Sequence, residues 1–118
     1  MDAVIWHNPS CSKSRGARQL LDDNGVDARE VRYLVDAPDR GALEEVLRKL
    51  GTDDPATITR TSEPRYRELG LAGADRDTLL DALAANPVLI ERPIVIVGDR
   101  AVLARPPELL LELLDGST

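Results

Sequence analysis

The one cysteine of this chain, Cys11, lies where the sequence predicts that a strand ends and a helix begins. At a helix N-terminus, unpaired backbone N–H groups and the positive end of the helix dipole favour a thiolate over a thiol. Because the thiolate is the attacking form of cysteine, this position is typical of an activated nucleophile. A helix N-terminus also binds anions, so one position could hold an oxyanion and attack it.

The alternative for a free cysteine is an inert, buried core residue, which is the commoner case. The neighbours of Cys11 favour the reactive interpretation, since residues 8–10 and 12–14 are Asn, Pro, Ser, Ser, Lys and Ser. Lys13 and Arg15 also fall in the predicted first helical turn, where acidic residues are normally preferred. Cations there cost stability unless an anion occupies the site, although Lys13 also fits a solvated surface charge.

The spacing from Cys11 to Ser14 is the one-thiol version of the redox Cys-x-x-Cys pair. Ser14 could donate a hydrogen bond to the thiolate, but it cannot resolve a disulfide. An outside thiol must therefore resolve any oxidation of Cys11. A tyrosine-phosphatase loop would need Cys-x5-Arg, and the sequence argues against one, because Ala17 occupies the required position and Arg18 follows one residue late.

Three arginines distant from the cysteine stand beside prolines or other breaks in the pattern: Arg60, Arg92 and Arg105. A guanidinium donates forked, charge-assisted hydrogen bonds that suit a tetrahedral oxyanion. A single such arginine would be interpreted as an exposed loop charge. His7, directly before the cysteine loop, could orient the site or transfer a proton, and its alternative role is a structural hydrogen bond at a strand end.

The apolar pattern predicts the elements that position these residues. In the first part it predicts a buried strand at residues 3–6, a helix at 12–24 and a strand at 30–35. The remainder predicts a helix from Asp39 to Gly51, helical turns around 55–58 and 64–69, a helix from Asp75 to Asn86, strands at 94–97 and 101–104, and a last helix from Pro106 or Pro107.

This order predicts an α/β, thioredoxin-like fold. A βαβ start requires parallel pairing with a right-handed crossover, and a ββα end adds an antiparallel pair. We therefore expect one domain over residues 1–118 with a mixed four-stranded sheet (βαβ…ββα) and a helical insert between the halves, at about residues 38–87. In such folds the proline before the third strand is typically cis, which predicts a cis bond between Arg92 and Pro93.

Composition narrows the function classes. The net charge of −6 argues against nucleic acid as a partner. No stretch approaches the roughly 20 apolar residues that cross a bilayer, and no signal peptide is visible, so we expect no membrane partner. One cysteine and one histidine argue against a metal site and an internal disulfide. We expect a cytoplasmic monomer in a reducing compartment.

At these residues, and in order along the whole chain, the sequence resembles the glutaredoxin-coupled arsenate reductase family. The cysteine loop alone would be less specific than the set of motifs. These motifs are His-Asn-Pro-Ser-Cys-Ser-Lys-Ser-Arg at residues 7–15, Arg60 with Glu63-Pro64, Tyr66 and Leu69-Gly70-Leu71, Arg92-Pro93-Ile94-Val95, and Arg105-Pro106 with Glu108.

The resemblance implies the reduction of arsenate to arsenite. Cys11 then matches the nucleophile, and Arg60, Arg92 and Arg105 match the oxyanion-binding arginines. In the implied course the thiolate attacks arsenic, a low-molecular-weight thiol adds, and a glutaredoxin-type partner resolves the mixed disulfide as arsenite leaves. The residues that we expect to support the site are His7, Asn8, Ser14, Arg15 and Pro93.

The thiol donor and two other functions stay open at this point. We expect no tightly bound cofactor, with glutathione as co-substrate, or mycothiol if the GC-rich bias of the composition reflects an actinobacterial source. One alternative is a thiol-sensing regulator that binds a partner such as RNA polymerase, although such regulators usually resemble a Cys-x-x-Cys form that Ser14 interrupts. The other is a general monothiol oxidoreductase acting on glutathionylated proteins.

Overall fold

Four strands form one mixed sheet in the order β2-β1-β3-β4 in the computed structural model, which describes residues 2–114. β1 pairs in parallel with β2 and antiparallel with β3, and β3 pairs antiparallel with β4. This topology confirms the expected thioredoxin-like fold, while both ends of the predicted 1–118 domain lie outside the described residues. The strands are β1 (Ala3–Trp6), β2 (Ala28–Val31), β3 (Ile94–Val97) and β4 (Arg100–Leu103).

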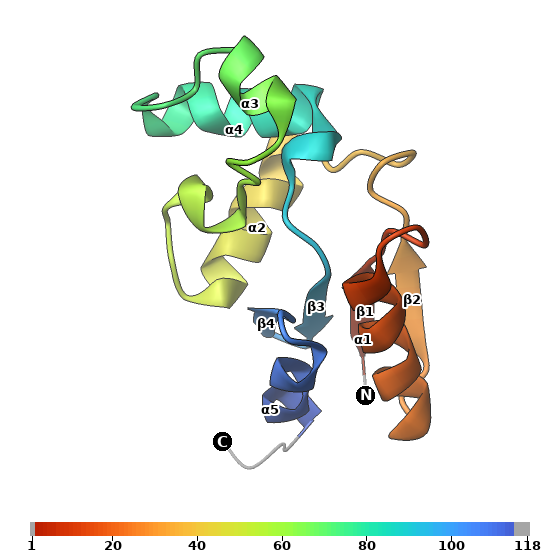
Figure 1. The fold of residues 1–118 in the computed structure, drawn as a ribbon. Helices are drawn as coiled ribbons and strands as arrows, with labels where there is room; N and C mark the ends of the chain where they lie inside the picture. Colours follow the sequence, from red (N-terminus) through yellow and green to blue (C-terminus); the bar gives the residue numbers. More distant parts are fainter. Residues whose placement is uncertain (1, 115–118) are drawn as a thin grey trace.

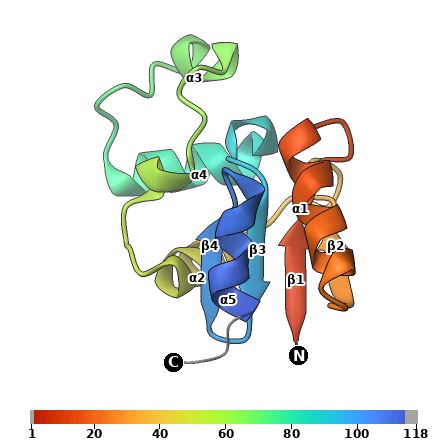
Figure 2. The same cartoon turned by 60° about the horizontal axis from the view of Figure 1, so that its bottom comes forward.

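Helices cover both faces of this sheet. In Figure 2, α1 and α5 lie on the near face, and in Figure 1 the helices between β2 and β3 gather on the opposite side. None of the helices in the described residues is long and apolar enough to cross a membrane. The helices are α1 (Ser12–Asp23), α2 (Arg40–Leu50), η1 (Pro55–Ile58), α3 (Pro64–Glu68), α4 (Arg76–Ala85), η2 (Pro87–Leu89), η3 (Pro107–Leu110) and α5 (Leu111–Leu114).

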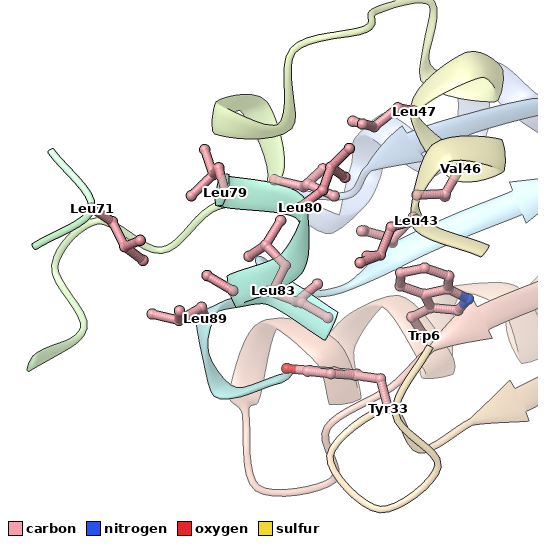
Figure 3. Packing of buried hydrophobic residues seen from close by; sticks show 14 residues of the cluster. Trp6, Tyr33, Leu43, Val46, Leu47, Leu71, Leu79, Leu80, Leu83 and Leu89 are labelled. Atoms are coloured by element: carbon pink, nitrogen blue, oxygen red, sulfur yellow. The ribbon is translucent and has the colours of Figure 1, made fainter. Parts of the chain in front are cut away.

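The strands divide the apolar residues between two cores because successive side chains point to opposite faces of a sheet. Ile5 and Val95 join Leu21 of α1 in the core beneath α1 and α5. Trp6 and Ile94 face the other way and join the core formed with α2 and α4, part of which Figure 3 shows. Both cores therefore hold the ends of β1 and β3 in place beside the thiol loop.

The second strand differs from its prediction at residues 30–35. β2 ends at Val31, and the chain then turns, because the N–H groups of Val35 and Asp36 both donate to the carbonyl of Arg32 (2.9 and 2.8 Å). The sequence predicts a longer strand because polar and apolar residues alternate from Glu30 onward, with Val31 and Tyr33 on one face. Smaller differences are that α1 ends at Asp23, β4 spans Arg100–Leu103, and the last helix begins with the 3₁₀ turn η3.

Candidate active site

Cys11 is the N-cap residue of α1, with extended backbone dihedrals (φ −99°, ψ 124°). The loop before it closes on itself, because the Cys11 N–H donates to the Asn8 carbonyl (3.0 Å) and the Ser10 N–H donates to Asn8 Oδ1 (3.0 Å). The Arg15 N–H donates to the Cys11 carbonyl (2.9 Å) and so starts the helical ladder. The thiol therefore lies at the helix N-terminus, where the sequence places it.

The surroundings of Cys11 favour its thiolate. Partial burial raises the pKa of the thiol, but the backbone N–H groups of Ser14 and Lys13 lower it. The guanidinium of Arg92 lowers it further, both by its charge and by a hydrogen bond to the sulfur. Together these groups outweigh burial, and the pKa of Cys11 is lowered from its ordinary value.

The Ser14 side chain does not have the role predicted for it. Its hydroxyl is fully buried, lies 2.6 Å from His7 Nδ1 and accepts the Asn8 N–H at 2.9 Å. The backbone N–H of Ser14, not its hydroxyl, supports the thiolate of Cys11. Ser14 therefore joins the end of β1 to the first turn of α1 and fixes the loop between them.

His7 is buried at the end of β1 and forms the other half of this contact. Burial lowers the pKa of its imidazole, and the carboxylate of Glu30 raises it. The surrounding arginines lower the pKa further; these are Arg32, Arg18 and Arg15. Glu30 is itself held by the Arg18 side chain at 2.9 Å. The lowered pKa keeps His7 neutral at physiological pH, which suits a structural contact with Ser14 better than a general acid.

Arg92 brings a positive charge to the thiol from the far end of the insert. Its peptide bond to Pro93 is cis, as predicted, and directly precedes β3. Its Nη1 contacts the neighbouring Glu91 carboxylate at 3.2 Å. Its Nε is buried without a hydrogen-bond partner, the one such side-chain atom among residues 2–114. A buried donor without a partner is costly, so this nitrogen points to a ligand that would accept from it.

The other predicted arginines occupy different places around Arg92. Arg105 Nη1 donates to the Arg92 carbonyl (3.1 Å), and the bond from Arg105 to Pro106 is also cis. The Arg60 guanidinium pairs with the Glu63 carboxylate (3.5 Å), and the Arg60 backbone N–H donates to the Leu89 carbonyl (2.7 Å).

Arg15 is exposed and donates to the Pro9 carbonyl at 2.9 Å. It therefore braces the thiol loop with a side chain that also adds positive charge beside the loop.

Tyr33, which falls within the strand predicted at residues 30–35, lies near this group of side chains. It is 1% exposed. Burial raises the pKa of its phenol, Arg92, Arg60 and an Asn8 hydrogen bond lower it, and Cys11 raises it. The net effect is a raised pKa and a neutral phenol. The position of Tyr33 in the sequence could have indicated this place. β1 and β2 pair in parallel with Trp6 opposite Val31, so Tyr33 lies just beyond β2 where the thiol loop lies just beyond β1.

No group of three or more His, Cys, Asp or Glu side chains in the described part of the chain could hold a metal ion. The chemical character of the site comes instead from one thiol, backbone N–H groups and guanidiniums. These groups together can attract a tetrahedral oxyanion, hold it by charge-assisted hydrogen bonds and attack its central atom.

The fold and the site define a thioredoxin-like protein with a single activated thiol at a helix N-terminus. The ArsC family matches residues 6–113, and the chain belongs to this family.

Relatives cover nearly the whole chain. An arsenate reductase of Neisseria meningitidis serogroup B is 43% identical over 106 residues, covering 88% of this chain and 91% of that protein. An arsenate reductase of Haemophilus influenzae is 40% identical over 116 residues, covering 97% and 100%. The structure of an arsenate reductase from Vibrio cholerae superposes with a TM-score of 0.92 at 39% identity, covering 95% of this chain and 97% of that one.

Proposed function

We propose that this protein is a thiol-dependent arsenate reductase with Cys11 as its nucleophile. The observation that carries the proposal is the pairing of an N-cap thiol with Arg92, whose guanidinium lowers the thiol pKa while its buried Nε has no partner. An oxyanion at this point would accept from that nitrogen and present its central atom to the sulfur. Arsenate is the anion because the arsenate reductases above share the family and most of the chain.

The first step forms a bond between Cys11 sulfur and arsenic. The thiolate supplies the electron pair, one As–O bond breaks, and the departing oxygen leaves as water after protonation. Arsenic remains at oxidation state +5. The proposed oxyanion-binding residues are Arg60, Arg92 and Arg105, which would hold the remaining oxygens by charge-assisted hydrogen bonds.

Reduction then requires two thiols from outside the chain, because Cys11 is its only cysteine. A first external thiol replaces a second oxygen on arsenic. A second external thiol attacks the sulfur of the first, so that an S–S bond forms and the As–S electron pair stays on arsenic. Water then releases arsenite and Cys11. In sum, one arsenate and two thiols give one arsenite, one disulfide and one water.

We propose glutathione or mycothiol as the first thiol and a glutaredoxin-like protein as the source of the second. The lone cysteine supports this division, since the chain has no second thiol with which to resolve an adduct on Cys11. We propose a cytoplasmic location, because both thiols must stay reduced to react. We further propose a monomer without a tightly bound cofactor.

Arsenite formation with each pair of donors tests the proposal. Purified protein is given arsenate and either glutathione or mycothiol, each with and without its glutaredoxin-type partner. We expect sustained arsenite release with one small thiol and its partner, at one disulfide per arsenite. No arsenite above the protein-free rate with any pair would contradict the proposed function.

A further inference from the structure

Glu91 directly precedes Arg92 in the segment that joins the helical insert to β3, coloured cyan in Figure 1. Its backbone pairs with the segment that carries Arg60. The Glu91 N–H donates to the Ile58 carbonyl (2.8 Å), and the Arg60 N–H donates to the Leu89 carbonyl (2.7 Å). An antiparallel bridge lies between these two bonds, so the fold fixes the backbone of Glu91 beside both arginines.

The Glu91 side chain holds one nitrogen of the Arg92 guanidinium. Its Oε1 lies 3.2 Å from Arg92 Nη1, and the two side chains are 25% and 16% exposed. The Nε and Nη2 of a guanidinium form a forked edge that suits two oxygens of an anion, and Nη1 lies outside this edge. Because Arg92 Nε is buried without a hydrogen-bond partner, Glu91 contacts a different nitrogen from the one that still needs an acceptor.

We propose that Glu91 is a positioning residue, whose carboxylate holds Arg92 Nη1 so that the Nε edge of the guanidinium is presented to the oxyanion beside Cys11. An unrestrained arginine side chain samples many rotamers, and binding must immobilise it. A guanidinium that is held before the anion arrives loses less entropy on binding, which raises the affinity. The inference rests on the proposed function in that Arg92 binds the oxyanion, but it holds for any tetrahedral oxyanion.

The charge of Glu91 makes this role testable by the sign of an effect. A carboxylate repels a nearby anion, so its removal would strengthen anion binding if charge alone mattered. Loss of the contact that orients Arg92 would weaken anion binding instead. Because ion pairs near the surface contribute little to stability, we expect substitution of Glu91 to leave the free energy of unfolding nearly unchanged.

The test compares two substitutions of Glu91 with one at a distant ion pair. Glu91→Ala removes both the charge and the contact, whereas Glu91→Gln keeps an oxygen that can accept from Arg92 Nη1. Glu44→Ala is the matched control, because Glu44 lies in α2 and pairs with Arg76 Nη1 at 2.9 Å. It changes the net charge by the same amount as Glu91→Ala. Chemical denaturation checks that all three variants keep the stability of the parent.

Anion binding is measured by how far sulfate or arsenate slows the alkylation of Cys11 by iodoacetamide. Sulfate reports on the site without any reduction, so the result does not depend on whether arsenate is the substrate. We expect Glu91→Ala to weaken protection by both anions about fivefold or more, as for the loss of a hydrogen bond. We expect a smaller loss in Glu91→Gln and none in Glu44→Ala.

Three results would overturn the inference. One is protection in Glu91→Ala that equals or exceeds that of the parent, as charge alone would give. Another is a loss in Glu91→Gln or Glu44→Ala as large as that in Glu91→Ala. The third is no protection of the parent thiol by either anion. Protection that depends on Glu91 without arsenite formation would support the role of Glu91 and contradict only the proposed function.

Discussion

Cys11 combines two kinds of stabilisation that are separable by substitution. The backbone N–H groups of Ser14 and Lys13 persist whatever their side chains are, whereas the contribution of Arg92 disappears with its guanidinium. Because these groups lower the pKa of the thiol, the thiolate persists below the pH at which a free cysteine is protonated. Reactivity should then fall only as the pH drops through this lowered value.

The prediction concerns the alkylation rate of Cys11 as a function of pH. We expect its midpoint to lie below the roughly 8.5 of free cysteine, and Arg92→Met to move it upward. Lys13→Met is the matched control, since it removes a charge from the same turn but keeps the N–H, and we expect a smaller shift. A parent midpoint at or above that of free cysteine would contradict this account of the site.

Arg92 and Arg105 are predicted to hold the substrate. Arg92→Ala and Arg105→Ala should each lower kcat/KM for arsenate roughly 10- to 100-fold, since a hydrogen bond to a charged group contributes about 1.5–3 kcal/mol. Because Arg105 donates to the Arg92 carbonyl, the double variant should lose less than the two single effects combined. Steady-state kinetics give all three values, and unchanged kinetics in both single variants would remove the oxyanion-binding assignment.

At the scale of elements, the helices α1 and α2 begin in different ways. α1 begins at Cys11 without any side-chain cap, which leaves its N-terminus open to an anion. α2 begins at Asp39, whose carboxylate accepts the Ala42 N–H (2.8 Å) and closes that helix end. The capped helix supports the sheet, and the uncapped helix carries the chemistry.

This difference predicts the effect of changing the cap of α2. Asp39→Ala should lower the free energy of unfolding by about 1 kcal/mol, while Asp39→Asn, which also caps well, should cost a few tenths at most. Chemical denaturation measures both. Arsenate kinetics should stay unchanged in each variant, because Asp39 lies outside the thiol loop. Equal destabilisation by both substitutions would show that the cap is not what Asp39 contributes.

Sequence reasoning found most of the elements because their signals are local. Proline, glycine and Asp caps mark the helix ends, and β1, β3 and β4 coincide with short apolar runs. It failed at the end of β2, where the Arg32 carbonyl accepts two N–H groups and turns the chain. The two hydrogen bonds of that turn are local, but a strand-like alternation through Tyr33 concealed it.

The same limit applies to the site. Cys11 is evident from its type and its place before a helix, and Arg92 from the proline that follows it. The partner of the Ser14 hydroxyl could not be predicted in this way, because that hydroxyl contacts His7 across the loop. Tyr33 lies beside the thiol loop through the parallel pairing of β1 and β2, which the βαβ order implies but whose exact register no local pattern records.

At the scale of the whole molecule, the proposed reaction needs groups from this chain and thiols from its partners. The cores beneath α1 and beside α4 hold the loop, Arg92 and Arg105 in one place, although these come from opposite ends of the sequence. In the proposed reaction the chain supplies the nucleophile and the groups that hold the anion. Both reducing equivalents must come from outside, because no second cysteine exists.

The measurement that tests this account most directly is arsenite release by the parent protein and by Cys11→Ser under identical conditions. Each receives arsenate, the competent small thiol and the glutaredoxin-type partner, with Ser10→Ala as a control for change in the same loop. The account predicts steady arsenite release from the parent and from Ser10→Ala, and none above background from Cys11→Ser. Full activity in Cys11→Ser would contradict the central role of this thiol.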